Sequence, residues 1–228
     1  MALKGSRRRA AEKALASSAE KRKCYVIGIT GPIGAGKSEV VNHIRANYLC
    51  RVFGTDDIAK DVSAPGGICY ERLRGLLPQE AFDRKTGLMD RGKVSELMYA
   101  DVQLRQEMND IIHPAVGYML GAELDKEKRH GLLDFCIIES ALYDGGGFAL
   151  LCKEVWNVTA SDEIRTQRLI ESRGYSAEKI KSIFESQSKY DKMRRKLRVQ
   201  IDNSGALADT LSQVDAEMNR LIPGSKRT

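Results

Sequence analysis

The sequence predicts an α/β fold in which helices cover both faces of a doubly wound, parallel, five-stranded sheet. Short apolar runs rich in β-forming residues alternate along the chain with longer segments of helical pattern, as expected for strands joined by crossover helices. One long run, Leu132–Ile138, is apolar except for a single aspartate and is typical of a strand that is buried on both faces. Glycines follow the first strand directly, so we expect a tight loop before the next helix.

The first part of the chain supports two strands and two helices. Cys24–Ile29 is apolar and rich in β-forming residues, and the helical pattern of Ser38–Asn47 follows the glycine-rich loop. Arg51–Phe53 is expected to be a second short strand, and Asp56–Val62 begins another helix. That helix should stop at Ala64–Gly67, where a proline and two glycines break the pattern.

Residues 68–129 have a mainly helical pattern, with breaks expected near Pro78, Gly87 and Pro114. The stretch is too long for a simple crossover, so we expect a small helical subdomain, residues 60–129, inserted between the second and third strands. The remaining strands are expected at 132–138, 154–159 and 199–201, and the remaining helices at 162–173, 176–196 and 207–221. The predicted organisation is a core (24–59, 130–160 and 197–222), the inserted subdomain and a charged helical pair (161–196).

The formal net charge of +6 arises in an N-terminal tail, residues 1–23. Eight Lys and Arg residues accompany only two Glu residues there, so residues 24–228 carry no net charge. The tail has no apolar stripe that would hold a helix on a core, and we interpret it as disordered or a frayed helix. Contact with nucleic acid or an anionic surface is the alternative interpretation for the tail, whereas the folded part gives no reason to expect a nucleic-acid partner.

Composition also excludes several other classes. No apolar run approaches the roughly 18 residues of a membrane helix, and the N-terminus lacks the apolar segment of a signal peptide. The five cysteines are widely spaced and form no CxxC pair, which argues against a zinc site or a disulfide framework. We therefore expect a cytoplasmic protein without a membrane partner; the sequence leaves its oligomeric state open, with a monomer favoured.

The glycine-rich segment Gly31-Pro-Ile-Gly-Ala-Gly-Lys-Ser38 matches GxxxxGK[ST] at every fixed position. It lies between a predicted strand and a predicted helix, as a P-loop requires. The glycines at 31, 34 and 36 allow the loop, including Ala35, to curl so that its N–H groups point at phosphate oxygens. The N-terminus of the following helix adds its positive dipole end.

The residues that end this motif have separate expected roles. Lys37 can reach the β- and γ-phosphates of ATP, and Ser38 can offer its hydroxyl to Mg²⁺. The amide of Glu39 is expected to complete the cradle. The chain lacks an Asn-Lys-x-Asp guanine signature and is too short for most motor ATPases, so the motif favours ATP-dependent phosphoryl transfer.

Carboxylates follow two of the predicted strands. Glu139 directly follows the run Leu132–Ile138, at the sheet edge where ligands bind in doubly wound folds, and is our candidate for holding Mg²⁺; capping of the next turn is the alternative. Asp56 follows the second strand and is the candidate base, with a helix N-cap as the alternative role. Asp57 is the rival carboxylate, but it would point about 100° around the helix from Asp56. Lys60, four residues after Asp56, would share its face, keep it ionised and contact substrate phosphate.

The charged helical pair 161–196 carries Arg168, Arg173, Arg194 and Arg195. A basic pair of helices late in a small P-loop protein is typical of a lid that closes over ATP. We single out Arg168 and Arg173 as nucleotide-binding candidates and interpret the other two as solvated surface charge.

Taken together, these residues resemble the dephospho-CoA kinase family over residues 24–222. The resemblance depends on the order and spacing of four segments: Gly28–Ser38, Thr55–Lys60, Asn109–Pro114 and Ile201–Gly205. It implies a P-loop kinase that uses ATP and Mg²⁺ to phosphorylate the ribose 3′-hydroxyl of dephospho-CoA, the final step of coenzyme A synthesis. It further implies that Asp56 is the base.

The resemblance also assigns residues to ligands. The helical insertion would bind the CoA moiety, with His113 near substrate; a histidine satisfied at a helix start is the alternative. Arg168 and Arg173 would serve the lid, while Asn203 and Gly205 would lie near the adenine.

The chain departs from the family pattern at several positions. Gly54 stands where an Asp is usual, Lys60 stands where Arg is common, and residues 140–147 lack the usual Pro-Leu-Leu and a following Glu. Lysine cannot form arginine's bidentate fork, so these changes bear on the acceptor more than on kinase chemistry. Two alternatives are another small-molecule or nucleotide kinase of this architecture and a nucleotide-binding protein that acts through its basic tail.

Overall fold

The computed structural model describes residue 22, residues 24–143 and residues 145–227. The predicted tail therefore lies outside the described residues except for Arg22, whose guanidinium pairs with the carboxylate of Asp134 at 2.6 Å. None of the described helices combines the length and the apolar character that a membrane span needs.

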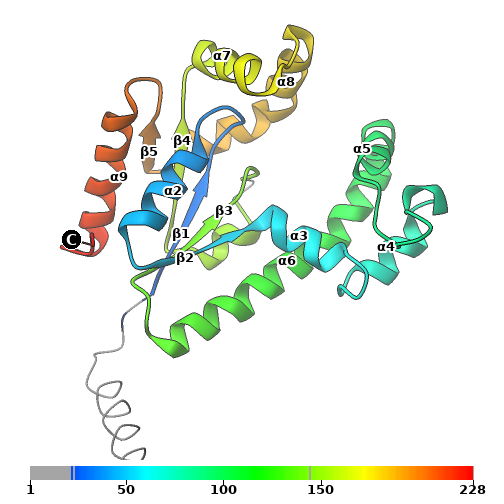
Figure 1. Ribbon diagram of the computed structural model, residues 1–228, viewed down its shortest axis with the longest axis horizontal. Coiled ribbons are helices and arrows are strands. Elements are labelled where there is room, and N and C mark those ends of the chain that lie inside the picture. The colour runs from blue at the N-terminus through cyan, green and yellow to red at the C-terminus, as the bar shows by residue number, and fades with distance from the viewer. Residues whose placement is uncertain (1–21, 23, 144, 228) are drawn as a thin grey trace, which may run out of the picture.

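Strands and helices alternate along the described chain, as Figure 1 shows. The strands are β1 (Tyr25–Thr30), β2 (Cys50–Gly54), β3 (Phe135–Glu139), β4 (Glu154–Thr159) and β5 (Val199–Asp202). The α-helices are α2 (Lys37–Asn47), α3 (Thr55–Ser63), α4 (Tyr70–Leu76), α5 (Arg91–Ala100), α6 (Val102–His130), α7 (Asp162–Arg173), α8 (Ala177–Arg194) and α9 (Leu207–Leu221). Two short 3₁₀ helices are η1 (Gln79–Ala81) and η2 (Gly147–Leu151).

The five strands form one sheet in the order β2-β3-β1-β4-β5, and every pair is parallel. The predicted five-stranded parallel sheet is therefore confirmed. Its register places Glu139 beside Ile29 of β1 and Gly54 of β2. Because the carboxyl ends of parallel strands share one edge, the segments that follow β1, β2 and β3 meet there.

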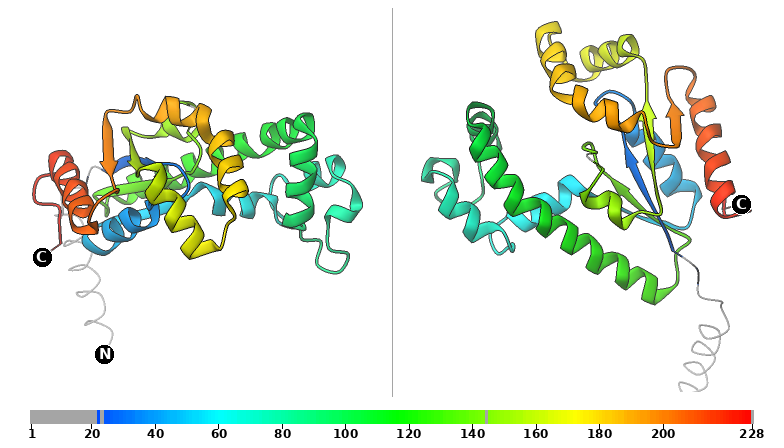
Figure 2. Two further views of the ribbon diagram at one scale, coloured as in Figure 1. Left: turned by 90° about the horizontal axis from the view of Figure 1, so that it is seen from above. Right: turned by 180° about the vertical axis from the view of Figure 1, so that it is seen from behind.

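Apolar side chains alternate between the two faces of the sheet and build two cores. One core packs α2 and α9 against Ile27, Phe135 and Trp156. The other packs α6 and η2 against Val26 and Ile138. The views in Figure 2 show these helices on opposite sides of the sheet. Strands buried on both faces explain the continuous apolar runs in the sequence.

The predicted helical insertion consists of α4, η1, α5 and α6 together with the end of α3, and it extends to one side of the sheet (Figure 1). The predicted break near Pro114 is wrong, because α6 continues through it without interruption. A proline inside a helix costs about 3 kcal/mol. Buried side chains on both sides of Pro114, among them Met108, Val116 and Leu120, hold the two halves of α6 on the core.

The predicted bounds of β4, α7 and α9 match the structure residue for residue. The third strand begins later than predicted, at Phe135, because Leu132 is 67% exposed and lies before the first paired residue. Helices α7 and α8 stand above the carboxyl edge of the sheet (Figure 1). The division into core, substrate subdomain and lid stays a prediction.

Candidate active site

The phosphate loop, residues 31–36, joins β1 to α2 and needs glycine for steric reasons. Gly36 has φ 89° and precedes the first residue of α2, Lys37. A Cβ atom on Gly36 would lie 2.1 Å from Nδ2 of Asn203. Only glycine combines this left-handed backbone with so close an approach.

Side chains from the start of α2 and from distant elements hold the carbonyl groups of the loop. The bonds run from Lys37 Nζ to Gly31 O at 2.8 Å, from Arg165 Nε to Ile33 O at 2.9 Å, from Arg168 Nη1 to Gly34 O at 3.4 Å and from Asn203 Nδ2 to Ala35 O at 2.8 Å. With its carbonyl oxygens engaged in this way, the loop can turn amide N–H groups toward an anion. Some of these amides are already bonded within the chain: Ile33 N donates to Oε1 of Gln187 at 3.2 Å, and Ala35 N donates to Pro32 O at 3.2 Å.

A cavity of about 680 Å³, the P-loop cavity, opens on this loop. It is lined by Ile33, Gly34, Gly36, Lys37, Ser38, Glu39, Arg168, Leu169, Ser172, Arg173, Asn203, Gly205 and Leu207. All the residues predicted to bind nucleotide lie on its walls except Gly31 and Ala35. Its volume is in the usual range for small-molecule sites.

Asn203 is a buried polar residue on the wall of this cavity, only 3% exposed. Its Nδ2 is bonded to Ala35 O, and its Oδ1 accepts a hydrogen bond from Thr210 Oγ1 at 3.0 Å. Arg168 adds a bond from Nη2 to the Asn203 carbonyl at 2.9 Å. Asn203 therefore fixes the phosphate loop to the end of β5.

A second cavity of about 430 Å³, the α3 cavity, lies at the carboxyl edge of β2 and β3. It is lined by Ile33, Lys37, Ser38, Gly54, Asp56, Asp57, Lys60, Glu139, Ala141, Arg173 and Gln187. The strand register explains this gathering, since Glu139 pairs with Gly54 and α3 begins at the next residue. The candidates Asp56, Lys60, Glu139 and Ser38 are thus brought together.

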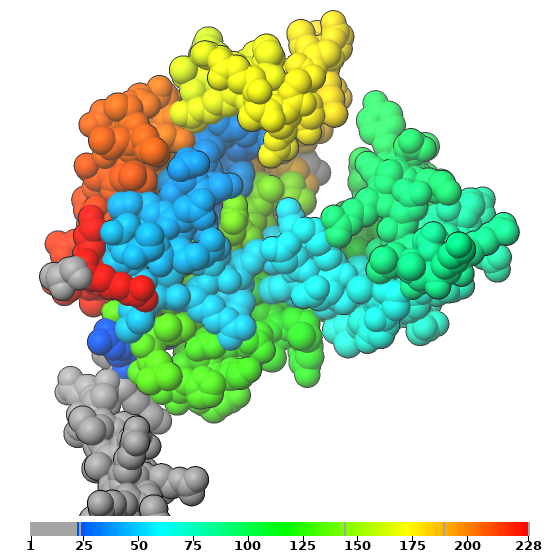
Figure 3. Space-filling view, in the orientation of Figure 1, coloured from blue at the N-terminus to red at the C-terminus, as the bar shows by residue number. Residues whose placement is uncertain are grey.

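The two cavities share four lining residues: Ile33, Lys37, Ser38 and Arg173. Figure 3 shows the molecule hollowed between the yellow α7–α8 pair, the blue segment after β1 and the cyan-to-green insertion. Burial lowers the pKa of Lys37 to about 8, while the nearby carboxylates of Glu139 and Asp56 oppose that shift. A buried ammonium at the junction favours an anionic ligand there.

The start of α3 shows whether Asp56 caps the helix and which carboxylate pairs with Lys60. Gly54 is the N-cap of α3 and Asp56 is its second residue, so Asp56 does not cap the helix. The ammonium of Lys60 pairs with Asp57 at 2.7 Å rather than with Asp56. Positions i and i+3 lie side by side on a helix as well as i and i+4, and the structure selects the former.

Glu139 makes no side-chain hydrogen bond within the described part of the chain. Whether it caps the following turn stays open, because residue 144 of that turn lies outside the described residues. His113 lies on the exposed face of α6 and lines neither cavity. It is in the interior of that helix, so its interpretation as a satisfied helix-start histidine is wrong.

The interpretation of Arg194 as solvated surface charge is wrong, because the side chain is 1% exposed. Its Nη1 donates to Ala141 O at 2.9 Å, and Nη2 bonds to the carboxylate of Asp191. Arg195, one residue later, is exposed as expected. Both arginines end the same helix, and only packing decides which of them turns inward.

Sequence reasoning missed Arg165 and Gln187. Arg165 is 4% exposed, stacks on the ring of Phe184 at 4.0 Å and bonds to Ile33 O. Arg165 lies three residues before Arg168, so both share one helix face. That spacing could have identified Arg165 as a site residue from the sequence. Gln187 carried no comparable signal, because its bond to Ile33 spans 154 residues.

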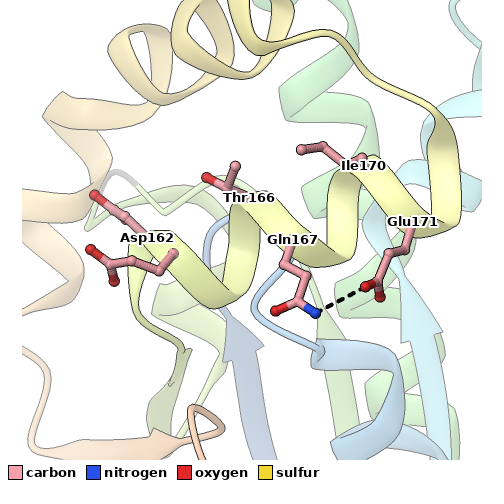
Figure 4. Close-up of a pocket in the computed structure, with 6 residues that line it drawn as sticks. Asp162, Thr166, Gln167, Ile170 and Glu171 are labelled. Atoms are coloured by element: carbon pink, nitrogen blue, oxygen red, sulfur yellow. Dashed lines mark hydrogen bonds between the residues drawn. The ribbon is translucent and has the colours of Figure 1, made fainter.

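A separate cavity of about 560 Å³ lies along the outer face of α7 (Figure 4). Asp162, Glu163, Thr166, Gln167, Ile170 and Glu171 line it, and the Gln167 amide donates to Glu171 at 2.9 Å. None of the predicted site residues contributes to its walls. Three carboxylates make it unfavourable for a phosphate-bearing ligand.

Comparison with known proteins decides the family of this chain. The family model described as dephospho-CoA kinase matches residues 25–209. The chain belongs to the dephospho-CoA kinase family. That match covers every strand, the phosphate loop and both cavities.

Curated relatives in this family match most of the chain. A dephospho-CoA kinase from Syntrophotalea carbinolica is 29% identical over 88% of this chain and 94% of its own length. One from Staphylococcus epidermidis is 32% identical over 79% of this chain and 87% of its own length.

Solved structures support the same architecture. A crystal structure from Thermus thermophilus has a TM-score of 0.74 and 25% identity, covering 89% of this chain and all of that one. The dephospho-CoA kinase from Campylobacter jejuni has a TM-score of 0.64 at 17% identity, covering 87% of this chain and 98% of its own, which supports the fold.

Proposed function

We propose that this protein transfers the γ-phosphoryl group of ATP to the ribose 3′-hydroxyl of dephospho-CoA, the final step of coenzyme A synthesis. The single observation that carries the proposal is the meeting of two cavities at Lys37, Ser38 and Arg173. A kinase needs a nucleotide and an acceptor that approach one another at the transferring group. Membership of the dephospho-CoA kinase family supports the choice of acceptor.

In this proposal ATP occupies the P-loop cavity. Its phosphates receive hydrogen bonds from the loop amides and from Lys37, and Arg168 and Arg173 lie on the wall formed by α7. Gly205 and Asn203 line the same cavity beyond the loop, where the adenosine would extend. Helices α7 and α8 act as the lid that excludes water.

The acceptor occupies the α3 cavity with its hydroxyl toward Asp56. Asp56 takes the hydroxyl proton as the acceptor oxygen forms its bond to the γ-phosphorus, and the bond from that phosphorus to the β–γ bridging oxygen breaks. ADP leaves with that oxygen. Lys37, buried at the junction of the cavities, stabilises the charge that develops on the phosphoryl oxygens.

The residues around Ser38 and Glu139 fit a magnesium ion. A hydroxyl and a carboxylate are hard oxygen donors of the kind that Mg²⁺ prefers, and both line the α3 cavity. Among the described residues there is no group of three or more His, Cys, Asp or Glu that would hold a metal. Mg²⁺ commonly takes its other ligands from phosphates and water, and it neutralises phosphate charge when bound.

A coupled assay with ATP, Mg²⁺ and dephospho-CoA tests the proposal. Dephospho-CoA should be phosphorylated far faster than nucleoside monophosphates, with mass spectrometry and ³¹P NMR locating the new phosphate at the 3′ position. Faster turnover of a nucleotide acceptor would favour the alternative kinase. Deleting residues 1–23 should leave turnover unchanged. If the full-length protein showed no turnover and the deletion abolished nucleotide binding, the non-enzyme alternative would be favoured.

The assignment of Asp56 has its own test. Asp56→Asn should remove most turnover and leave ATP binding nearly intact, because an amide accepts hydrogen bonds but is no useful base. Asp61→Asn, an exposed change on the same helix, is the matched control and should keep wild-type rates. Near-normal turnover by Asp56→Asn would disprove the assignment.

A further inference from the structure

The wall of the α3 cavity contains a space that either residue 54 or Asp57 can fill. A Cβ atom built on Gly54 would lie 3.1 Å from Oδ2 and 3.6 Å from Cγ of Asp57. A longer side chain at position 54 would therefore compete with the Asp57 carboxylate. The backbone of Gly54, with φ −87° and ψ 122°, is open to any residue, so conformation does not explain the glycine.

Asp57 is joined to Lys60 on the same cavity wall. The Lys60 ammonium donates to Oδ1 of Asp57 at 2.7 Å. This hydrogen bond and the charge of Lys60 lower the pKa of Asp57. One oxygen of the Asp57 carboxylate, Oδ1, accepts the bond from Lys60. The other, Oδ2, lies beside Gly54, so the carboxylate connects α3 to the end of β2.

Folding stability does not account for this pair. The side chains of Asp57 and Lys60 are 76% and 46% exposed, and exposed ion pairs of this kind contribute little to stability. The pair instead restricts a long, flexible lysine to one position. An ammonium has three N–H donors, and one bond to Asp57 leaves two for a ligand in the cavity.

We propose that Asp57 is a positioning residue of the acceptor site. It holds Lys60 against the cavity wall so that the ammonium meets a phosphate group of the acceptor, and Gly54 leaves the space that the carboxylate needs. The inference rests on the proposed function, because it assigns the α3 cavity to a phosphate-bearing acceptor. It also relates two departures of this chain: the carboxylate missing at position 54 is supplied from position 57.

Steady-state kinetics with single and double variants test the coupling. Asp57→Ala should raise KM for dephospho-CoA about 3- to 10-fold and leave kcat and KM for ATP within about twofold of wild type. Lys60→Ala should raise the same KM about 10- to 100-fold, since it removes a charge-assisted contact. The double variant should be no worse than Lys60→Ala, because Asp57 acts through Lys60.

A reciprocal swap tests the shared space. Gly54→Asp combined with Asp57→Ala should bring KM for dephospho-CoA back to within about threefold of wild type, whereas Gly54→Asp alone should be impaired by two competing carboxylates. Asp61→Ala, on the same exposed helix and outside the cavity wall, is the control. Calorimetry with dephospho-CoA alone should reproduce the KM order, and thermal unfolding should show Asp57→Ala, Lys60→Ala and Asp61→Ala within about 2–4 °C of wild type.

Three results would overturn the inference. The first is an Asp57→Ala variant with an unchanged or lower KM, which would mean that Asp57 is a bystander or only repels the acceptor. The second is a swap that is no better than Asp57→Ala alone. The third is a wild-type protein that does not phosphorylate dephospho-CoA, which overturns the proposed function as well; normal wild-type turnover with an unaffected Asp57→Ala overturns this inference alone.

Discussion

Replacing Asn203 with alanine should release the phosphate loop from the end of β5. The amide of this buried residue donates to Ala35 O at 2.8 Å and accepts from Thr210 Oγ1 at 3.0 Å. Alanine removes both bonds and leaves the Ala35 carbonyl without its side-chain donor. The Thr210 hydroxyl has a single hydrogen and can donate it to Asp202 O at 3.1 Å instead, so the main penalty falls on the loop.

The magnitude follows from these contacts. A net contribution of about 1 kcal/mol for each bond, with up to about 2 kcal/mol more for the unpaired carbonyl, predicts a loss of roughly 2–4 kcal/mol in the free energy of unfolding. At about 2–4 °C per kcal/mol for a chain of this size, Tm should fall by roughly 4–16 °C. The same bonds hold the loop in the conformation that binds phosphate, so their loss should also weaken ATP binding. The Asn203→Ala variant should bind ATP about tenfold more weakly than wild type, which corresponds to roughly 1.4 kcal/mol.

Thermal unfolding followed by circular dichroism and calorimetry with ATP measure the two effects. Thr210→Val is the matched control: it removes the bond to Asn203 Oδ1 but keeps the Asn203 donor to Ala35. It should lose stability and retain ATP affinity. If Asn203→Ala had a Tm within about 1 °C of wild type, or bound ATP as well as Thr210→Val does, the reasoning would be refuted.

Three further predictions concern the same region. Burial lowers the pKa of Lys37 to about 8 in the ligand-free protein, so its ammonium loses a proton as the pH rises through that value. Calorimetry should therefore show the Kd for ATP increasing in this pH range, and Lys37→Met should lack this pH dependence. Arg194→Leu should cost about 2–4 kcal/mol in urea unfolding by leaving Asp191 unpaired, against about 0.5 kcal/mol or less for the exposed Arg195→Leu; equal losses would contradict the role of burial. Gly36→Ala, forced into φ 89° at about 1–2 kcal/mol, should fold by circular dichroism but lose ATP binding, and retained binding would disprove the steric argument.

Local signals carried most of the fold prediction. The predicted bounds of β4, α7 and α9 agree with the structure, because apolar periodicity and capping act over a few neighbouring residues. Pro114 shows the limit of such signals. A proline is a strong local helix breaker, yet α6 passes through it because buried side chains on both sides pack on the core.

Some features of the candidate site were predictable from local sequence, and others depended on packing. The strand-end positions of Asp56 and Glu139 predicted that both carboxylates would face one crevice, and the parallel register brings both to the α3 cavity. The partner of Lys60 was not predictable, because Asp56 and Asp57 are both within reach on a helix; the structure pairs the ammonium with Asp57. Their functional roles remain predictions.

By itself, the sequence determined a P-loop after the first strand of a parallel sheet, because eight contiguous residues specify the loop and alternating apolar patterns specify the elements around it. Only the tertiary structure decided how that loop is held. Arg165, Gln187 and Asn203 reach it from positions more than 130 residues away, and their contacts exist because the crossover helices and the strand order bring those segments to one edge. The junction of the two cavities at Lys37 has the same origin: packing between distant segments creates it, and no local pattern encodes it.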